Sequence, residues 1–335
     1  MKLNNICYRN KALGLLGLAL LGTLTACEEE FWETEQYRKE IYIVSGDNNI
    51  FGQEYTFDEG GSIGYLSVYA GGVTGIETDV DVLLEHDPEV LREYNSRVHV
   101  EDYDNYAYEL PADRYSIENM TVTLKQGADV PYSLCPIHVN IEGMNPDEEY
   151  FIPLRIASVS NYMVSESKRD VLFQVFMKND YATTASSTYY NMTGTLQSPG
   201  SLTPIAVSAT KLVVPVSRYG IRILPSSNTT TDGRELRKQG IVVTVHPDEM
   251  VDINVLNDEG LPSGEYKQCC KVTLESWIKE DASISVQESS SSFGDVSNYD
   301  PETKTFTLYY RYKLPEDSDY TTMTETMSLL NTNIE

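Results

Sequence analysis

The chain has 335 residues, with 51 acidic and 25 basic side chains and a net charge of −26 at pH 7. Such a surface repels the phosphates of nucleic acids and anionic lipid head groups, so we expect neither as a partner. The length is enough for about two domains, each with a sizeable core.

Residues 1–26 are predicted to form a lipoprotein signal peptide. Cations near the start are followed by an unbroken run of apolar and small residues from 12 to 25. This order is typical of a secretory signal, and the run is shorter than the about 20 apolar residues of a spanning helix. The run ends in Leu-Thr-Ala-Cys at Cys27, which resembles the lipobox of bacterial lipoproteins. The resemblance implies that Cys27 is lipidated and that its acyl chains anchor the protein to a membrane.

Residues 27–40 are predicted to be a lipidated acidic tether. Glu28, Glu29 and Glu30 follow Cys27 directly. An acidic cluster at this position resembles the export signal of Bacteroidetes surface lipoproteins. It implies an outer-membrane location facing the cell exterior; the alternative is a solvated charge run beside a tether.

Residues 41–178 are predicted to form a first β-sandwich domain. Short runs of β-forming residues are separated by Gly, Asn and Asp, a pattern typical of a sandwich. The predicted strands are 41–44, 65–69, 80–84, 121–124, 137–141, 150–156 and 171–177. One helix is expected at about 87–95, because Pro88 suits a first turn and Val90, Leu91 and Tyr94 share one helical face.

Residues 179–188 are small and polar and are predicted to be a linker. A second β-rich domain is expected over 189–335. Its clearest predicted strands are 211–216, 220–224, 241–245, 271–277 and 305–312. The tail from Pro315 is acidic and rich in Thr and Met, and we expect it to be loosely ordered.

Several motifs follow one another in a fixed order along the first block. They are Asp79-Val-Asp-Val-Leu-Leu, Glu93-Tyr-Asn, Leu110-Pro, Tyr115-Ser, Thr121-Val-Thr-Leu-Lys-Gln-Gly and Tyr150-Phe-Ile-Pro-Leu-Arg-Ile. This series resembles the immunoglobulin-like N-terminal domain of Bacteroidetes surface lipoproteins of unknown function, which also precedes some secreted endo-N-acetylglucosaminidases.

The second block resembles the C-terminal β-sandwich domain that accompanies it. Tyr190-Asn-Met-Thr-Gly, Thr210-Lys-Leu-Val-Val-Pro and Phe306-Thr-Leu-Tyr-Tyr-Arg-Tyr carry this resemblance. The pairing implies an all-β protein of two tandem immunoglobulin-like sandwiches. It also implies a glycan-related role, because such proteins are commonly encoded with glycan-import systems.

No catalytic machinery is visible in the sequence. Residues 60–64, Gly-Gly-Ser-Ile-Gly, match the G-x-S-x-G pattern of the nucleophile elbow. A predicted β-strand follows them, however, where a hydrolase has a helix. We interpret them as a glycine-rich hairpin turn. The histidines are scattered without metal-site spacing, so we expect neither an enzyme nor a metal or other cofactor. The loop around Asp102 could hold calcium through oxygen ligands, although it lacks a recognised loop pattern.

The cysteines leave two interpretations open. Cys135 could link to Cys269 or to Cys270, or these thiols could be buried and unpaired.

Five aromatic residues are candidates for stacking on sugar rings. They are Trp277, the loop residues Tyr103 and Tyr106, and Tyr310 and Tyr312 on one face of the last predicted strand. Core packing is the alternative role for each of them. We therefore expect a non-catalytic surface lipoprotein that binds glycans for an outer-membrane importer of a polysaccharide-utilisation system. The alternative is a structural or adhesive surface protein with protein-binding modules.

Overall fold

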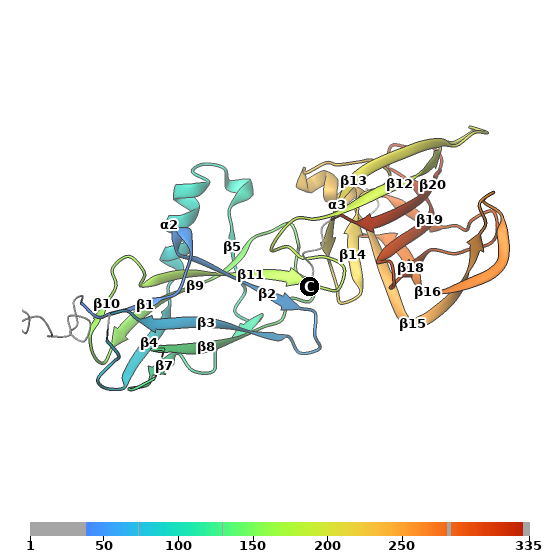
Figure 1. Ribbon diagram of the computed structural model, residues 1–335. Helices are drawn as coiled ribbons and strands as arrows, with labels where there is room; N and C mark the ends of the chain where they lie inside the picture. Colours follow the sequence, from blue (N-terminus) through green and yellow to red (C-terminus); the bar gives the residue numbers. More distant parts are fainter. Residues whose placement is uncertain (1–37, 73, 129, 280–282, 331–335) are drawn as a thin grey trace, which may run out of the picture.

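The computed structural model describes residues 38–72, 74–128, 130–279 and 283–330. Cys27, the glutamates after it and the signal peptide lie outside these residues, so lipidation stays a prediction. Figure 1 shows two β-rich lobes side by side, one formed by β1–β11 and the other by β12–β20. The predicted all-β class with two tandem domains is confirmed.

The first lobe consists of two sheets. One sheet has the order β10-β1-β3-β8-β6, and the other has the order β2-β11-β9-β4-β7 with β5 added on β9. The strands of the first sheet are β1 (Glu40–Ile43), β3 (Ser62–Ala70), β6 (Tyr115–Ser116), β8 (Tyr132–Val139) and β10 (Met163–Val164). Those of the second are β2 (Ile50–Thr56), β4 (Val80–His86), β5 (Tyr108–Glu109), β7 (Thr121–Leu124), β9 (Tyr150–Val159) and β11 (Asp170–Lys178).

Alternating side chains build the core between these two sheets. On β4, Val80, Val82 and Leu84 are buried while the residues between them face outward. On β3, Leu66 and Val68 are fully buried in the same cluster. Because successive strand residues point to opposite faces, each sheet offers one apolar surface, and the two surfaces pack together.

Helix α2 (Pro88–Val98) covers the outer side of the second sheet, where its Leu91 and Tyr94 pack on Phe151 and Leu172. The predicted helix is thus confirmed, and it extends one turn further. Its N-cap is Asp87, whose side chain accepts a hydrogen bond from the backbone N–H of Glu89. Such a cap satisfies one of the free donors at a helix start.

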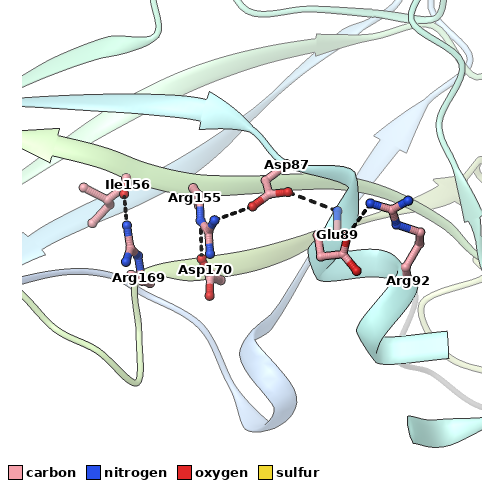
Figure 2. Close-up of polar contacts among 7 residues, drawn as sticks. All are labelled: Asp87, Glu89, Arg92, Arg155, Ile156, Arg169 and Asp170. Carbon is pink, nitrogen blue, oxygen red and sulfur yellow. Dashed lines mark hydrogen bonds and ion pairs between the residues drawn. The ribbon is translucent and has the colours of Figure 1, made fainter. Parts of the chain in front are cut away.

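Figure 2 shows how this helix start is fixed to the sheet. Arg155 on β9 lies 2.6 Å from a carboxylate oxygen of Asp87, and its Nε donates to Asp170 on β11 at 3.0 Å. One guanidinium therefore joins two neighbouring strands and the helix cap. Beside it, Arg169, which precedes Asp170 in the chain, donates to the carbonyl of Ile156 at 3.2 Å.

The Gly-Gly-Ser-Ile-Gly segment is a turn, but not the hairpin turn that we expected. Gly60 and Gly61 have positive φ angles of 88° and 92°, and Ser62 begins β3. The preceding strand β2 belongs to the opposite sheet, so the turn carries the chain from one sheet to the other. Ser62 Oγ accepts from the Thr56 backbone N–H at 3.0 Å, which is a role in turn geometry.

The second lobe is one nine-stranded sheet that closes on itself. Its order is β17-β19-β18-β16-β15-β14-β13-β12-β20, and an additional pairing of β19 with β20 completes the ring. Its strands are β12 (Thr188–Gln197), β13 (Ile205–Pro215), β14 (Gly220–Ile223), β15 (Ile241–Leu256), β16 (Pro262–Ser276), β17 (Ser285–Glu288), β18 (Asn298–Asp300), β19 (Thr305–Lys313) and β20 (Thr321–Leu329). Closure leaves few exposed sheet edges.

The tail predicted to be loosely ordered is instead the strand that closes this sheet. Met323 and Met327 on β20 are fully buried, and β20 pairs with both β12 and β19. The alternation of Thr with Met and Glu in this segment indicates a strand, whereas its overall composition does not.

Residues 179–188, predicted as a linker, connect the two lobes, and half of them are buried. Tyr181 packs edge-on against Tyr299 and Phe306 in the core of the second lobe. The amide of Asn179 donates to the carbonyls of Ser217 and Gly220 at 2.8 and 2.9 Å. The segment therefore packs into the second lobe and is also bonded to the first, where the hydroxyl of Thr183 donates to Glu54 at 2.5 Å.

Candidate functional site: the cleft between the domains

A cleft of about 1070 Å³ lies between the two lobes. The first lobe contributes residues of the 99–108 loop, which follows α2, and the turn at 145–149. The second lobe contributes residues 231–237, including the start of helix α3 (Gly233–Gln239). In Figure 1, α2 lies on the upper side of the first lobe and α3 on the upper side of the second, near the junction of the lobes.

The 99–108 loop is held in place by a buried asparagine of α2. Asn95 donates from its amide to the carbonyl of Ala107 at 2.9 Å and accepts from the N–H of Ala107 at 3.0 Å. Tyr106 is fixed from the other side, because its hydroxyl donates to the carbonyl of Val100 at 2.7 Å. The loop therefore has a defined shape before any ligand arrives.

Aromatic rings form one part of the cleft wall. His99 lies between Tyr94 and Tyr106, with ring centroids 6.0 and 6.1 Å away. Tyr103 leans on Tyr106 at 5.1 Å, and Tyr108 lies 6.1 Å from Tyr150. Tyr106 and Tyr108 line the cleft, whereas Tyr103 is 69% exposed beside it. Such rings can stack on the C–H faces of sugars.

Carboxylates and two asparagine amides form the remainder of the first lobe's wall. Asp102 accepts from the Asn105 amide at 2.8 Å within the loop. In the 145–149 turn, Glu148 accepts from the Asn145 amide at 3.0 Å. Asp104 and Glu149 also line the cleft, and neither pairs with a cation among the described residues. This wall therefore presents several hydrogen-bond acceptors.

Two arginines of α3 supply donors from the opposite wall. Asp232 caps the helix by accepting from the backbone N–H groups of Arg234 and Glu235 at 2.9 and 3.1 Å. The side chains of Arg234 and Arg237 both line the cleft and form no ion pair with another described residue. Because a guanidinium carries five fixed donors, it can bond several hydroxyl oxygens of a ligand.

An ion pair beside the cleft joins the two lobes. Arg222 of β14 donates from Nη2 to Oδ1 of Asp147 at 2.7 Å and contacts its second oxygen through Nη1. Trp277 covers the guanidinium, with the ring centroid 4.4 Å from the arginine Cζ. The relative position of the two walls is therefore fixed by side chains as well as by the connecting backbone.

The aromatic candidates from the sequence separate into three groups. Tyr106 lines the cleft, and Tyr103 packs beside it. Trp277 is half-buried against Arg222, so one face of its indole is already occupied. Tyr310 is fully buried and Tyr312 is 8% exposed, so both are core residues of the second lobe and present no ring to a ligand. Alternation did place Tyr310 and Tyr312 on one face, but that face points inward.

The cleft also contains residues that the sequence did not single out for binding. Arg234 and Arg237 come from the other domain, and no local pattern relates them to the tyrosine loop. One local signal was available: Asp232 followed by Glu235 and basic residues is typical of a capped helix start.

Two further expectations concern metals and thiols. Among the described residues, no group of three or more His, Cys, Asp and Glu side chains is placed to bind a metal ion. Cys135 lies in the first lobe and Cys269 and Cys270 in the second; all three are buried, free thiols. The link from Cys135 to the adjacent pair is therefore absent. Neither described helix has the length and apolar character needed to cross a bilayer.

Two family models match the chain in succession. A model described as an N-terminal domain matches residues 37–163, and the companion model described as C-terminal matches residues 169–328. The chain belongs to this two-domain family. The structure refines the boundary, since β11 lies within the C-terminal match but pairs with β2 and β9 of the first lobe. No curated protein matches the sequence.

Solved structures share the whole two-domain fold. A Bacteroides ovatus protein of unknown function has 14% identity and a TM-score of 0.56, covering 87% of this chain and 93% of its own. A multidomain B. ovatus protein has 14% identity and a TM-score of 0.55, covering 88% and 95%. An auxiliary nutrient binding protein from Bacteroides thetaiotaomicron has 13% identity and a TM-score of 0.50, covering 84% and 89%.

Proposed function

We propose that the protein is a non-catalytic lipoprotein of the outer cell surface that binds glycans in the cleft between its two domains. The observation that carries the proposal is the composition of the cleft. Tyrosine rings and carboxylates line one wall, and two arginines face them from the other; Asp104, Glu149 and both arginines form no ion pair with another described residue. Sugars need an apolar surface for their C–H faces together with donors and acceptors for their hydroxyl groups.

The comparison with solved structures supports this function. One structure with the same two-domain fold is named as an auxiliary nutrient binding protein. A lipid anchor at Cys27 would place the cleft outside the cell, where an outer-membrane importer could receive a captured glycan. The sequence supports the anchor through the lipobox resemblance and the importer through the family resemblance; both are parts of the proposal.

Affinity gel electrophoresis of the full-length protein against soluble host and dietary polysaccharides tests the proposal. The test variants are Tyr108→Ala, which leaves the Tyr106 hydrogen bond intact, and Arg234→Ala on the opposite wall. Tyr266→Ala is the control, since this tyrosine on β16 is 63% exposed and lies outside the cleft.

We expect retardation by at least one glycan, and about tenfold weaker binding for each cleft variant, because an aromatic or charged contact is worth on the order of 1.4 kcal/mol. The control variant should bind as the wild type does. Absence of binding across the panel, or a failure of both cleft variants to weaken the binding of any glycan, would contradict the proposal. Hydrolysis of a glycan by the purified protein would contradict its non-catalytic part.

A further inference from the structure

A second aromatic surface lies on the outer face of the first lobe, away from the cleft. It belongs to the sheet β10-β1-β3-β8-β6, whose other face packs into the core. We call it the tyrosine face and define it by Tyr42, Ile63, Tyr65, Tyr69, Tyr132 and Leu134. Helix α2, the one α-helix among the described residues of this lobe, packs on the opposite sheet.

The exposure of these side chains is high for residues of their type. Ile63, Tyr65, Tyr132 and Leu134 are each between 45% and 49% exposed, and Tyr42 and Tyr69 are half-buried. Contiguous apolar surface of this kind is uncommon on soluble proteins and usually marks a binding surface.

Three of the tyrosines form a row that crosses three adjacent strands. The register pairs Tyr42 of β1 with Tyr69 of β3, and Tyr69 with Tyr132 of β8. The rings of Tyr42 and Tyr69 are 5.4 Å apart. Neighbouring strands are about 4.8 Å apart, so the row extends over about 10 Å. Tyr65 lies four residues from Tyr69 on the same outer face and lengthens the surface along the strand.

The polar tips of these rings are available to a ligand. None of the hydroxyls of Tyr42, Tyr65, Tyr69 and Tyr132 hydrogen-bonds to another described residue. A tyrosine ring therefore offers its flat side for stacking and its hydroxyl for a hydrogen bond, both at the same place.

The tyrosine face is almost free of charge in a strongly acidic protein. The outward positions of β3 are Ile63, Tyr65, Ser67 and Tyr69, and those of β8 are Tyr132, Leu134, Pro136 and His138. None of these carries a carboxylate, lysine or arginine, although the chain has 51 acids. The nearest outward acid of β1 is Glu40, at the start of that strand.

We propose that the tyrosine face binds an uncharged, extended polysaccharide, whose successive sugar rings stack on the row of tyrosines. This binding surface is separate from the cleft and does not depend on it. An uncharged chain matches a face without charge, and an extended chain can contact a flat sheet surface over several residues. An anionic polysaccharide would gain no ion pair on this face and would meet the negative field of the protein.

The same charge argument disfavours two other occupants. A second copy of the chain would bring another net charge of −26 toward the first, and the face provides no ion pairs to offset the repulsion. An anionic membrane surface would be repelled for the same reason.

Pull-down and depletion isotherms with the full-length protein test the proposal. The probes are three uncharged polysaccharides, regenerated cellulose, β-mannan and xylan, with polygalacturonate as the charged comparison. The test variant is Tyr65→Ala/Tyr132→Ala, which removes two exposed rings without opening the core. The matched control is Tyr266→Ala, and Tyr108→Ala reports on the cleft.

We expect binding to at least one uncharged probe but not to polygalacturonate, and at least tenfold weaker binding for Tyr65→Ala/Tyr132→Ala at an unchanged Tm. Tyr266→Ala should bind that probe as the wild type does. The proposal is overturned if no uncharged probe binds or if the double variant binds normally. It is also overturned if the variant instead abolishes dimerisation in sedimentation or binding to anionic vesicles. Loss of binding in Tyr108→Ala with normal binding by the double variant would support the cleft and refute the tyrosine face, so the two proposals fail separately.

Discussion

Arg222 and Asp147 join the two domains through a bidentate ion pair. Arg222 lies on β14 of the second lobe with a side chain only 4% exposed, and Asp147 lies in the turn before β9 of the first lobe. Trp277 covers the guanidinium from one side. Because Asp147 also lines the cleft, the pair couples the position of the second lobe to the shape of the cleft.

Replacement of Asp147 by Asn should loosen the junction of the lobes. The substitution keeps the shape but removes the charge, and a hydrogen bond to a charged group is worth about 2 kcal/mol. We expect unfolding in urea to lose about that free energy or to separate into two transitions. Asp104→Asn is the control, since Asp104 lines the same cleft and forms no ion pair with another described residue. Equal stability of the two variants would refute the coupling role of Asp147.

Trp277→Ala tests whether the tryptophan only packs on Arg222 or also stacks directly on a sugar ring. Loss of a partly desolvated cation–π contact should cost about 1–2 kcal/mol of stability, and Trp277→Phe should recover part of it. Packing on Arg222 alone predicts that Trp277→Phe restores glycan binding together with stability. Full stability in Trp277→Ala with abolished binding would instead make the indole a direct ligand contact.

The core of the second lobe contains a buried ion pair between Lys211 of β13 and Glu325 of β20. Lys211 Nζ donates to Glu325 at 2.6 Å and to the carbonyl of Leu224 at 2.9 Å, and Tyr310 donates to the other oxygen of Glu325 at 3.2 Å. Burial lowers the pKa of Lys211 and raises the pKa of Glu325. Removal of one partner leaves the other buried without compensation.

We expect Lys211→Met to cost about 3–5 kcal/mol of stability and Lys211→Met/Glu325→Leu to recover most of it. A carboxyl whose pKa is raised on folding stabilises most below its unfolded value and loses that contribution as pH rises. The penalty of Lys211→Met should therefore be smaller near pH 4 than at pH 7. Urea unfolding at both pH values measures this; a penalty that is equal at both, or a double variant as weak as the single one, would contradict it.

Cys135 should be unreactive in the folded protein. Burial raises the pKa of its thiol to about 11, from 9.0. At pH 8 only about 0.1% would be thiolate, the reactive form. Iodoacetamide labelling followed by peptide mapping should leave Cys135 unmodified until the protein is denatured.

The same shift predicts a pH dependence of stability. Because the folded-state pKa is the higher one, the neutral thiol favours folding below about pH 9, and this contribution is lost as pH rises toward 11. Cys135→Val cannot titrate, so its free energy of unfolding should decline less steeply than that of the wild type over this interval. Parallel curves would show that Cys135 does not contribute.

Gly194 should not tolerate a side chain. A Cβ at this position of β12 would lie 2.0 Å from the carbonyl oxygen of Thr324 on β20, which is backbone and cannot rotate away. Gly194→Ala should cost about 3 kcal/mol or more by forcing the two strands apart. Gly127→Ala is a comparison with open space but a positive φ of 71°, so it reports backbone strain alone. Thermal unfolding distinguishes the two.

The amino-acid sequence by itself determined the local features of this protein. The alternation of apolar and polar residues predicted most strands. The Asp87-Pro88 start, with Leu91 and Tyr94 on one face, predicted α2. Both patterns follow from the residue repeat within one strand or one helix. The order of motifs identified the two-domain family. Composition alone was misleading for the tail, where β20 is ordered by its pairing with β12 and β19.

The tertiary structure decided which tyrosines are available and which residues meet. Tyr310 and Tyr106 look alike in sequence, but closure of the second sheet buries one while the loop after α2 presents the other. Arg234 faces the tyrosine loop only because Asp147, Arg222 and the half-buried segment 179–188 fix the two lobes together. Contacts between residues so far apart in the chain depend on how whole domains pack, and no short sequence pattern encodes that packing.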